Sequence, residues 1–203
     1  GDDSANLSNV LNFTSTGSVT VELGNREIED AGVAGTPDVT YLGIDVINVT
    51  LDGTDNLRVE ATAGDDTVRV RPTGASSATV EVANQPIING TLIGVFTVDA
   101  DLGGVDTGNA TVIIEGPAGD DSFGIAGTPV TDLLVTIVGR EAVNLAATRE
   151  AITLEGAAGN DTFFVTPSAT VPMLVVGGDP ISASDVLNLE VAAGTVTFNP
   201  GPE

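Results

Sequence analysis

The residues of this sequence that could do chemistry are carboxylates placed in a recurring turn. The turn occurs as Gly64-Asp65-Asp66-Thr67, as Gly119-Asp120-Asp121-Ser122 and as Gly159-Asn160-Asp161-Thr162. Each copy follows an apolar residue, a glutamate, two variable residues and an alanine. Carboxylates can bind hard cations, and paired carboxylates can serve as acid and base in glycoside hydrolysis. Two partial copies lie near the chain ends, at Gly1-Asp2-Asp3-Ser4 and at Leu187–Val196.

The remaining composition leaves little other chemistry. The 203 residues include no histidine and no cysteine, and the six basic residues are all arginine. The chain therefore lacks the usual nucleophiles, general bases at neutral pH and transition-metal ligands. We expect no enzyme. The alternative is a β-helical enzyme that acts on polysaccharides through carboxylates, but the chain offers only six phenylalanines and one tyrosine as sugar platforms.

A formal net charge of −23 excludes several classes of partner. Nucleic acids and anionic membranes are disfavoured, because both are bound through clustered cations. No apolar run reaches the roughly 18 residues that a membrane-spanning helix needs, so no membrane insertion is expected. Repulsion among so many carboxylates destabilises a compact chain unless cations or high salt relieve it. The composition thus favours bound calcium, or a halophilic surface protein without specific calcium sites.

The acidic turns divide the chain into unequal repeats. Their glycines fall at positions 1, 64, 119, 159 and 194, so the spacing shortens along the chain. We expect a single repeat-built β domain with units at about 1–63, 64–118, 119–158 and 159–193 and a partial unit at 194–203. Because such units stack on one another, neighbouring units share one core.

The segments between the turns have the patterns of strands. Apolar and polar residues alternate over 17–23 and over 77–83, and Val68 to Arg71 alternates in the same way before a turn at 74–77. A β-hairpin is therefore expected after each acidic turn. The continuous apolar run Leu133–Val138 predicts a strand that is buried on both faces. These patterns predict an all-β fold, an elongated β-solenoid-like stack with hairpin excursions. The alternative is one or two antiparallel β-sandwich domains.

The acidic turns resemble the calcium-binding nonapeptide of RTX proteins. Gly156–Phe164 is similar to the pattern Gly-Gly-x-Gly-x-Asp-x-apolar-x, and segments 116–124 and 61–69 match at its fourth, sixth and eighth positions. The resemblance implies that the carboxylates, with carbonyls of the turn, bind Ca²⁺. The candidate ligands are Asp3, Asp65, Asp66, Asp120, Asp121 and Asp161. The alternative is that each copy is only a tight turn, since Asp and Asn hydrogen-bond to their own backbone.

The longer repeat unit is similar to the degenerate repeats of very large bacterial surface proteins, such as those of planctomycetes. That resemblance implies a structural protein at the cell surface or outside the cell, used as a surface-layer, filament or adhesin building block. Sequons of the form Asn-x-Ser/Thr give weak support for this location. They begin at Asn6, Asn12, Asn48, Asn89, Asn109 and Asn160.

The two partial copies predict how the chain assembles. The turn at 1–4 has no strand before it, and the strand at 187–191 has no acidic turn after it. We expect a head-to-tail contact in which the C-terminal strand of one copy extends a sheet of the next. The expected anchors are Leu187, Leu189, Val196 and Phe198. Because the chain opens with Gly1 rather than methionine, we expect a mature or excised piece, and the alternative partner is a neighbouring repeat of a longer chain.

Overall fold

The described part of the chain consists of strands. The computed structural model describes residues 9–31, 38–101, 109–126, 133–146, 151–168, 171–179 and 184–190. Within these ranges the chain forms eighteen β-strands and no helix, so the predicted all-β class is confirmed. None of the described residues belongs to a helix that could cross a membrane. Of the predicted site residues, Asp3, Val196 and Phe198 lie outside the described ranges.

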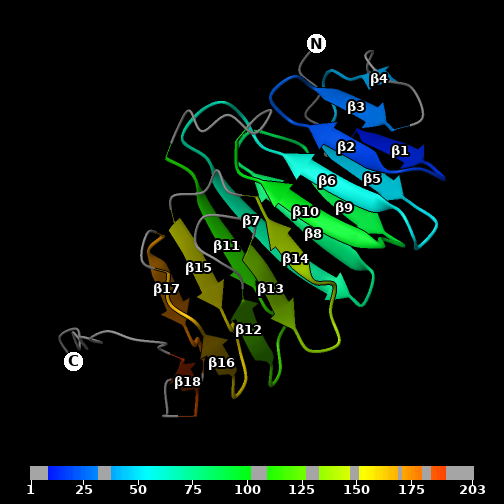
Figure 1. Cartoon of the computed structure of the whole chain (residues 1–203). Helices are drawn as coiled ribbons and strands as arrows, with labels where there is room; N and C mark the ends of the chain where they lie inside the picture. The colour runs from blue at the N-terminus through cyan, green and yellow to red at the C-terminus, as the bar shows by residue number, and fades with distance from the viewer. Residues whose placement is uncertain are drawn as a thin grey trace.

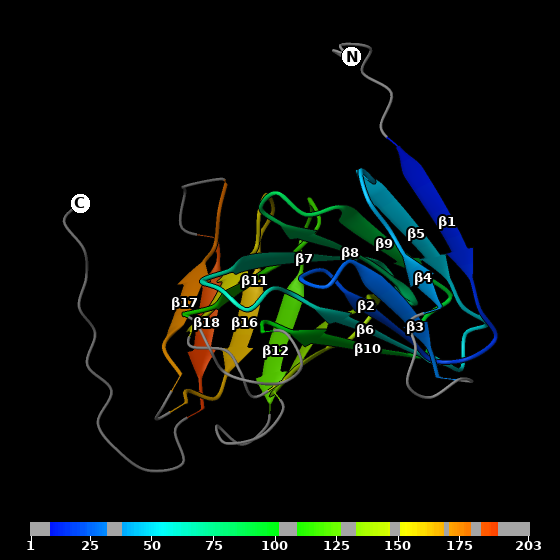
Figure 2. The ribbon, with the colours of Figure 1, turned by 90° about the horizontal axis from the view of Figure 1, so that it is seen from above.

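The strands form two sheets (Figure 1). The first sheet has eight strands in the order β1 (Val10–Thr14), β5 (Val46–Thr50), β9 (Ile87–Thr91), β8 (Ser77–Val82), β7 (Thr67–Gly74), β11 (Thr111–Glu115), β15 (Ala151–Glu155) and β17 (Met173–Val176). The second has ten, in the order β18 (Val186–Leu189), β16 (Thr162–Val165), β12 (Ser122–Ala126), β13 (Leu133–Ile137), β14 (Val143–Leu145), β10 (Val95–Asp99), β6 (Asn56–Glu60), β2 (Val19–Glu22), β3 (Glu27–Asp30) and β4 (Val39–Thr40). Figure 2 shows β1, β5 and β9 along one side and β2, β6 and β10 along the other.

Both sheets mix parallel and antiparallel pairs. Ten pairs are parallel, and they join strands from successive crossings of the chain between the sheets, such as β11 and β15. Six pairs are antiparallel and form the meanders β2–β3–β4, β7–β8–β9 and β12–β13–β14. The predicted hairpin is confirmed after the first acidic turn as the β7–β8 pair, in which Val70 lies opposite Val80, and after the second as the antiparallel β12–β13 pair. It is wrong after the third turn, where β16 pairs in parallel with β12 and β18 and the next strand, β17, belongs to the other sheet.

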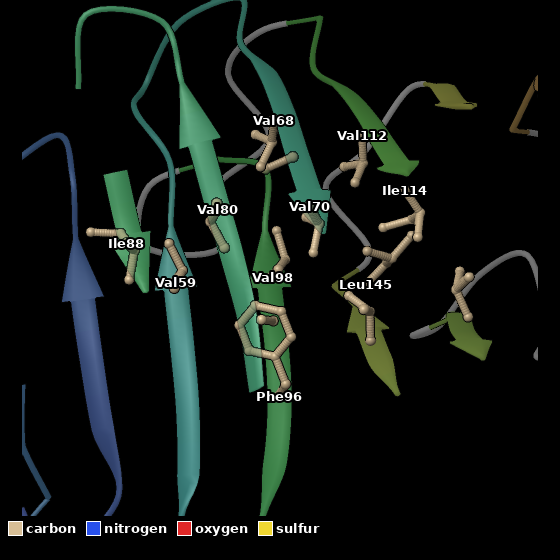
Figure 3. Packing of buried hydrophobic residues seen from close by; sticks show 14 of the residues in the cluster. Val59, Val68, Val70, Val80, Ile88, Phe96, Val98, Val112, Ile114 and Leu145 are labelled. Carbon is tan, nitrogen blue, oxygen red and sulfur yellow. The ribbon is translucent and has the colours of Figure 1, made fainter. Parts of the chain in front are cut away.

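The core lies between the two sheets (Figure 3). Every second residue of a strand points to the same side, so alternating sequences bury one face. Val70 and Val80 from the first sheet and Phe96 and Val98 from the second are at most 1% exposed. The core side chains are mainly aliphatic and β-branched, which suits a strand-rich fold.

One strand differs from its prediction. The run Leu133–Val138 was expected to be buried on both faces, and this prediction is wrong. In β13 buried and exposed residues alternate, so Leu134 is 36% exposed, and the following Val138 is 77% exposed. The reason is that β13 belongs to a meander of the second sheet and packs against the core with one face only.

Three of the sequons form an asparagine ladder across the first sheet. Asn12, Asn48 and Asn89 share one register position on β1, β5 and β9. Asn48 Nδ2 donates to Asn12 Oδ1 at 2.8 Å, and Asn89 Nδ2 donates to Asn48 Oδ1 at 3.0 Å. The threonine two residues later points to the same outer face in each strand. The Asn-x-Thr spacing therefore has a structural cause in these three strands.

Candidate functional site

Two of the acidic turns lie side by side. The turn at 116–121 leads from β11 to β12, and the turn at 156–161 leads from β15 to β16. Because β11 pairs in register with β15, and β12 with β16, the two turns stack. Gly116 N donates to Glu155 O at 2.8 Å, and Gly119 N donates to Ala158 O at 2.5 Å. Gly119 has φ of 118°, a conformation that side chains other than glycine rarely adopt.

The described residues of a third connection, 177–179 and 184–185 between β17 and β18, continue this stack. Gly159 N donates to Asp179 O at 2.8 Å. Asp185 directly precedes β18 as Asp161 directly precedes β16, because Val186 pairs with Thr162. Asp185 is not among the ligands predicted from the sequence, because the connection that contains it is longer than the other two turns and lacks their Gly-Asp/Asn-Asp spacing. The available signal was the pair Gly177-Gly178, which matches the start of the nonapeptide.

The aspartates that end these turns form a column, which we call the aspartate column (Asp121, Asp161 and Asp185). Asp121 N donates to Asp161 Oδ1 at 2.9 Å, and Asp161 N donates to Asp185 Oδ1 at 2.9 Å. The carboxylates of Asp161 and Asp185 thus each accept a hydrogen bond from the backbone of the neighbouring turn. A second row runs beside it, in which Asn160 N donates to Asp120 Oδ1 at 2.8 Å.

In two of the three aspartates of the column, the second carboxylate oxygen is buried without a hydrogen-bond partner among the described residues. Asp121 Oδ2 and Asp161 Oδ2 have no hydrogen-bond partner among the described residues, and Asp161 is 0% exposed. Burial raises the pKa of Asp161, and the charges of Asp185 and Asp120 raise it further. Burial and the charge of Asp161 likewise raise the pKa of Asp121. A buried carboxylate oxygen with no donor is costly, so the column favours a counter-charge or a proton.

Main-chain carbonyls line the same space. A β-carbon at Gly116 would lie 3.1 Å from Asp121 Oδ2 and 3.3 Å from Gly156 O. A β-carbon at Gly156 would collide with Asp161 Oδ2 and would lie 2.5 Å from Gly177 O. The glycines therefore leave room for a carboxylate beside a carbonyl of the next turn. Carboxylate and carbonyl oxygens together are the ligand set of calcium.

The carboxylates alone do not form a metal cage. In the described ranges no three acidic side chains converge closely enough to hold a metal ion. A cation in the column would take Asp121 Oδ2 and Asp161 Oδ2 together with carbonyl oxygens of the turns. Asp120 lies in the neighbouring row, where its Oδ1 accepts hydrogen bonds from Asn160 N and Asn160 Nδ2.

The first acidic turn lies elsewhere. It leads from β6 of the second sheet to β7 of the first, whereas the other turns cross in the opposite direction. Thr67 at the start of β7 pairs with Thr111 at the start of β11, so Asp66 and Asp121 are separated by the length of β11, roughly 16 Å. Asp66 Oδ2 accepts hydrogen bonds from Thr62 N at 2.8 Å and Thr62 Oγ1 at 2.6 Å. Asp65 Oδ1 accepts one from Asn109 N at 2.9 Å.

Comparisons with known proteins assign no function to this site. No family model, curated protein or solved structure matches this chain. The structure separates the predicted site residues into two groups. Asp120, Asp121 and Asp161 come together in one stack, and Asp65 and Asp66 lie at the opposite ends of the strands.

The core is open at its C-terminal end. Phe163 of β16 is 1% exposed, whereas Leu187, its register partner on the edge strand β18, is 46% exposed. Leu189 is packed only partly against the core. Both predicted anchors that lie in the described ranges are thus at the last rung, formed by β17 and β18. The first sheet also has partly buried core residues on its other edge strand, Leu11 and Phe13 of β1.

Proposed function

We propose that this chain is a non-enzymatic structural module of the cell surface, and that calcium bound along the aspartate column stabilises it. The observation that carries the proposal is the pair of buried, unpartnered oxygens Asp121 Oδ2 and Asp161 Oδ2 in adjacent turns. A calcium ion between the turns would neutralise both carboxylates and replace their missing hydrogen bonds. The net charge of −23 adds a general reason for cations to favour the folded chain.

The same geometry supports an elongated, solenoid-like stack as the architecture of the module. Successive crossings of the chain add one parallel strand to each sheet, as in β11, β15 and β17 of the first and β12, β16 and β18 of the second. The three antiparallel meanders are the hairpin excursions. Each acidic turn in the stack joins the two strands of one rung, one strand in each sheet.

Self-association through the ends of the stack is the second part of the proposal. In the first sheet two antiparallel pairs cancel in direction, so β1 and β17 run the same way. In the second sheet four antiparallel pairs cancel, so β4 and β18 also run the same way. A second copy placed by translation would extend both sheets with parallel pairs and cover Leu187. Such a contact is heterologous and propagates as a filament.

The alternative contact is covalent. The same junction in a longer chain would join neighbouring repeats, and the module would then be one segment of an extended surface protein. Both versions make the chain a building block outside the cell. The lack of histidine, cysteine and lysine supports a structural rather than catalytic role.

Calcium titration by isothermal calorimetry tests the proposed site. Wild type is expected to release a saturable heat that Asp161→Asn largely abolishes, because the substitution removes one charged ligand from the column. Asp65→Asn is the matched control, since Asp65 lies in the first turn and outside the column. Equal binding by wild type and Asp161→Asn, or no saturable binding by wild type, would overturn the proposed site.

A further inference from the structure

A second site candidate lies on a different part of the molecule. A cavity of about 620 Å³ is formed by the β2–β3 turn, the segment after β4, the first acidic turn and the β8–β9 turn. Its lining includes Asn25, Arg26, Thr40, Leu42, Thr62 and Gln85. The volume is in the range of pockets that hold small organic ligands, which is about 300–1,000 Å³.

Arg26 is the cation of this cavity. The other arginines in the described ranges are engaged: Arg58, Arg69 and Arg71 form ion pairs with acidic side chains, and Arg140 donates to Thr73 O at 2.9 Å. Among the described residues the Arg26 guanidinium makes no ion pair and no side-chain hydrogen bond. In a chain with 29 acidic residues, an arginine left uncompensated in a cavity is a site for an anionic group.

The backbone holds Arg26 in place. Arg26 has φ of 60°, which an arginine adopts at an energetic cost, and its carbonyl accepts a hydrogen bond from Tyr41 N at 3.0 Å. That bond ties the β2–β3 turn to the segment that carries Tyr41 and Leu42. The backbone from which the Arg26 side chain extends into the cavity is therefore held by two elements.

The side chains that line the cavity beside Arg26 are neutral. Gln85 supplies an amide, and Thr40 and Thr62 supply hydroxyls. Asn25 supplies its amide oxygen, because its Nδ2 donates to Glu22 Oε2 at 2.6 Å next to the cavity. Thr62 Oγ1 donates to Asp66 Oδ2, which leaves the Thr62 oxygen as an acceptor. Leu42 adds an apolar surface that is 74% exposed. This lining matches a ligand that carries one carboxylate for the cation, several hydroxyls for the amide and hydroxyl groups, and a C–H face for the aliphatic surface.

We propose that this cavity binds an acidic sugar, with the carboxylate of a uronic acid on Arg26 and its hydroxyls on the neighbouring amides and threonines. The proposal goes beyond the structural role, because it assigns a ligand to the surface of the module. The net charge of −23 repels polyanions and acidic faces of other copies of the chain. A terminal or isolated uronic acid therefore suits the site better than an acidic protein does.

The test is a titration of the isotope-labelled full chain followed by amide chemical shifts. D-glucuronic acid is the probe, and D-glucose and acetate at the same ionic strength are the matched ligands. We expect saturable shifts confined to residues 24–26, 40–42, 62–63 and 85, with glucose and acetate each binding at least tenfold more weakly. Arg26→Gln should weaken glucuronate binding to the level of glucose, whereas Arg140→Gln should leave it unchanged.

The same spectra report whether each variant is folded, so a misfolded variant cannot be mistaken for a loss of binding. Equal binding of glucose and glucuronate, or equal binding by wild type and Arg26→Gln, would overturn the role of the carboxylate. Acetate binding as tightly as glucuronate would show an anion site and overturn the assignment to a sugar. Shifts spread over the molecule, or none, would overturn the site itself.

Discussion

Asp161 Oδ1 accepts a 2.9 Å hydrogen bond from the backbone N–H of Asp121 in the neighbouring turn, while Asp161 Oδ2 is buried and has no partner in the described part of the chain. One side chain thus joins two turns and at the same time places an unsatisfied negative oxygen in the interior. The first of these features stabilises the stack, and the second destabilises it unless a cation or proton is bound.

Asp161→Asn should stabilise the chain when calcium is removed by a chelator. The substitution keeps an acceptor for Asp121 N, removes the buried charge, and places an amide donor beside the carbonyl of Gly177. A gain of about 1 kcal/mol in the free energy of unfolding is expected, the size of a typical hydrogen bond. Urea unfolding in chelator measures it. A loss of stability in Asp161→Asn under these conditions would contradict an unsatisfied charge at this position.

The advantage of Asp161→Asn should depend on pH in a defined direction. Burial raises the folded-state pKa of Asp161 above its unfolded value, so ionisation at neutral pH costs stability. The cost is absent below the unfolded pKa, which is about 3.9, and is complete above the folded pKa. Measured in chelator, the difference in unfolding free energy between variant and wild type should therefore shrink as the pH falls toward 4. A difference that grows on acidification would contradict this sign.

Phe163→Ala should be among the most damaging single substitutions in the described core. Phe163 is buried and its ring stacks on Phe123 with centroids 4.7 Å apart. Truncation of such a ring costs about 3–5 kcal/mol of unfolding free energy. Phe164→Ala is the control on the same strand, because Phe164 points outward and is exposed. Similar losses for the two variants would contradict the assignment of inner and outer faces in β16.

Glu115→Gln tests the charges on the outer face of the first sheet. Burial disfavours the charge of Glu115, but Arg71 and Arg69 outweigh it and hold its pKa below the usual range. The carboxylate pairs with Arg71 Nε at 3.1 Å and also with Arg69. We expect a loss of roughly 0.5–1 kcal/mol at low salt that diminishes in 1 M sodium chloride. The contribution of Glu115 should also fade as acid protonates it. A loss independent of salt would indicate packing rather than charge.

The sequence predicts the features of this fold that depend on neighbouring residues better than those that depend on contacts between distant residues. Alternation is a local property, so it placed Val68 and Val70 on the inner face of a strand and located the hairpin that follows. The partner of each strand is set by distant residues, and for that reason β13 could not be distinguished from a strand buried on both faces. The asparagine ladder shows the same limit, since Asn12, Asn48 and Asn89 are ordinary sequons until the register aligns them.

The candidate site was predictable to a similar extent. Asp121 and Asp161 were identified because their turns share the glycine spacing of the nonapeptide. The first turn shares it too, but it crosses between the sheets in the opposite direction, so Asp66 faces Thr62 rather than another acidic turn. The direction in which a turn crosses between the sheets is decided by strand pairing, so a local sequence motif does not indicate it. Asp185 was missed because its turn contains additional residues.

Leu187→Asp should weaken association of full-length chains without unfolding them. Leu187 is 46% exposed at the open end of the core, where a second copy would cover it. Sedimentation velocity at increasing protein concentration, with calcium present, should give long assemblies for wild type and monomers for the variant. Val138→Asp is the control, because Val138 is exposed away from the last rung. A wild-type chain that stays monomeric would contradict the filament and leave the covalent array as the form of the junction.

Thermal unfolding with and without calcium at constant ionic strength tests the central claim most directly. A ligand at one hundred times its Kd stabilises the folded state by about 2.7 kcal/mol, which corresponds to a rise in Tm of roughly 5–10 °C for a chain of this size. Wild type should show this rise in calcium but not in sodium chloride of equal ionic strength, and Asp161→Asn should show little of it. The same Tm for wild type in calcium and in chelator, or an equal rise in sodium chloride, would contradict a calcium site in the aspartate column.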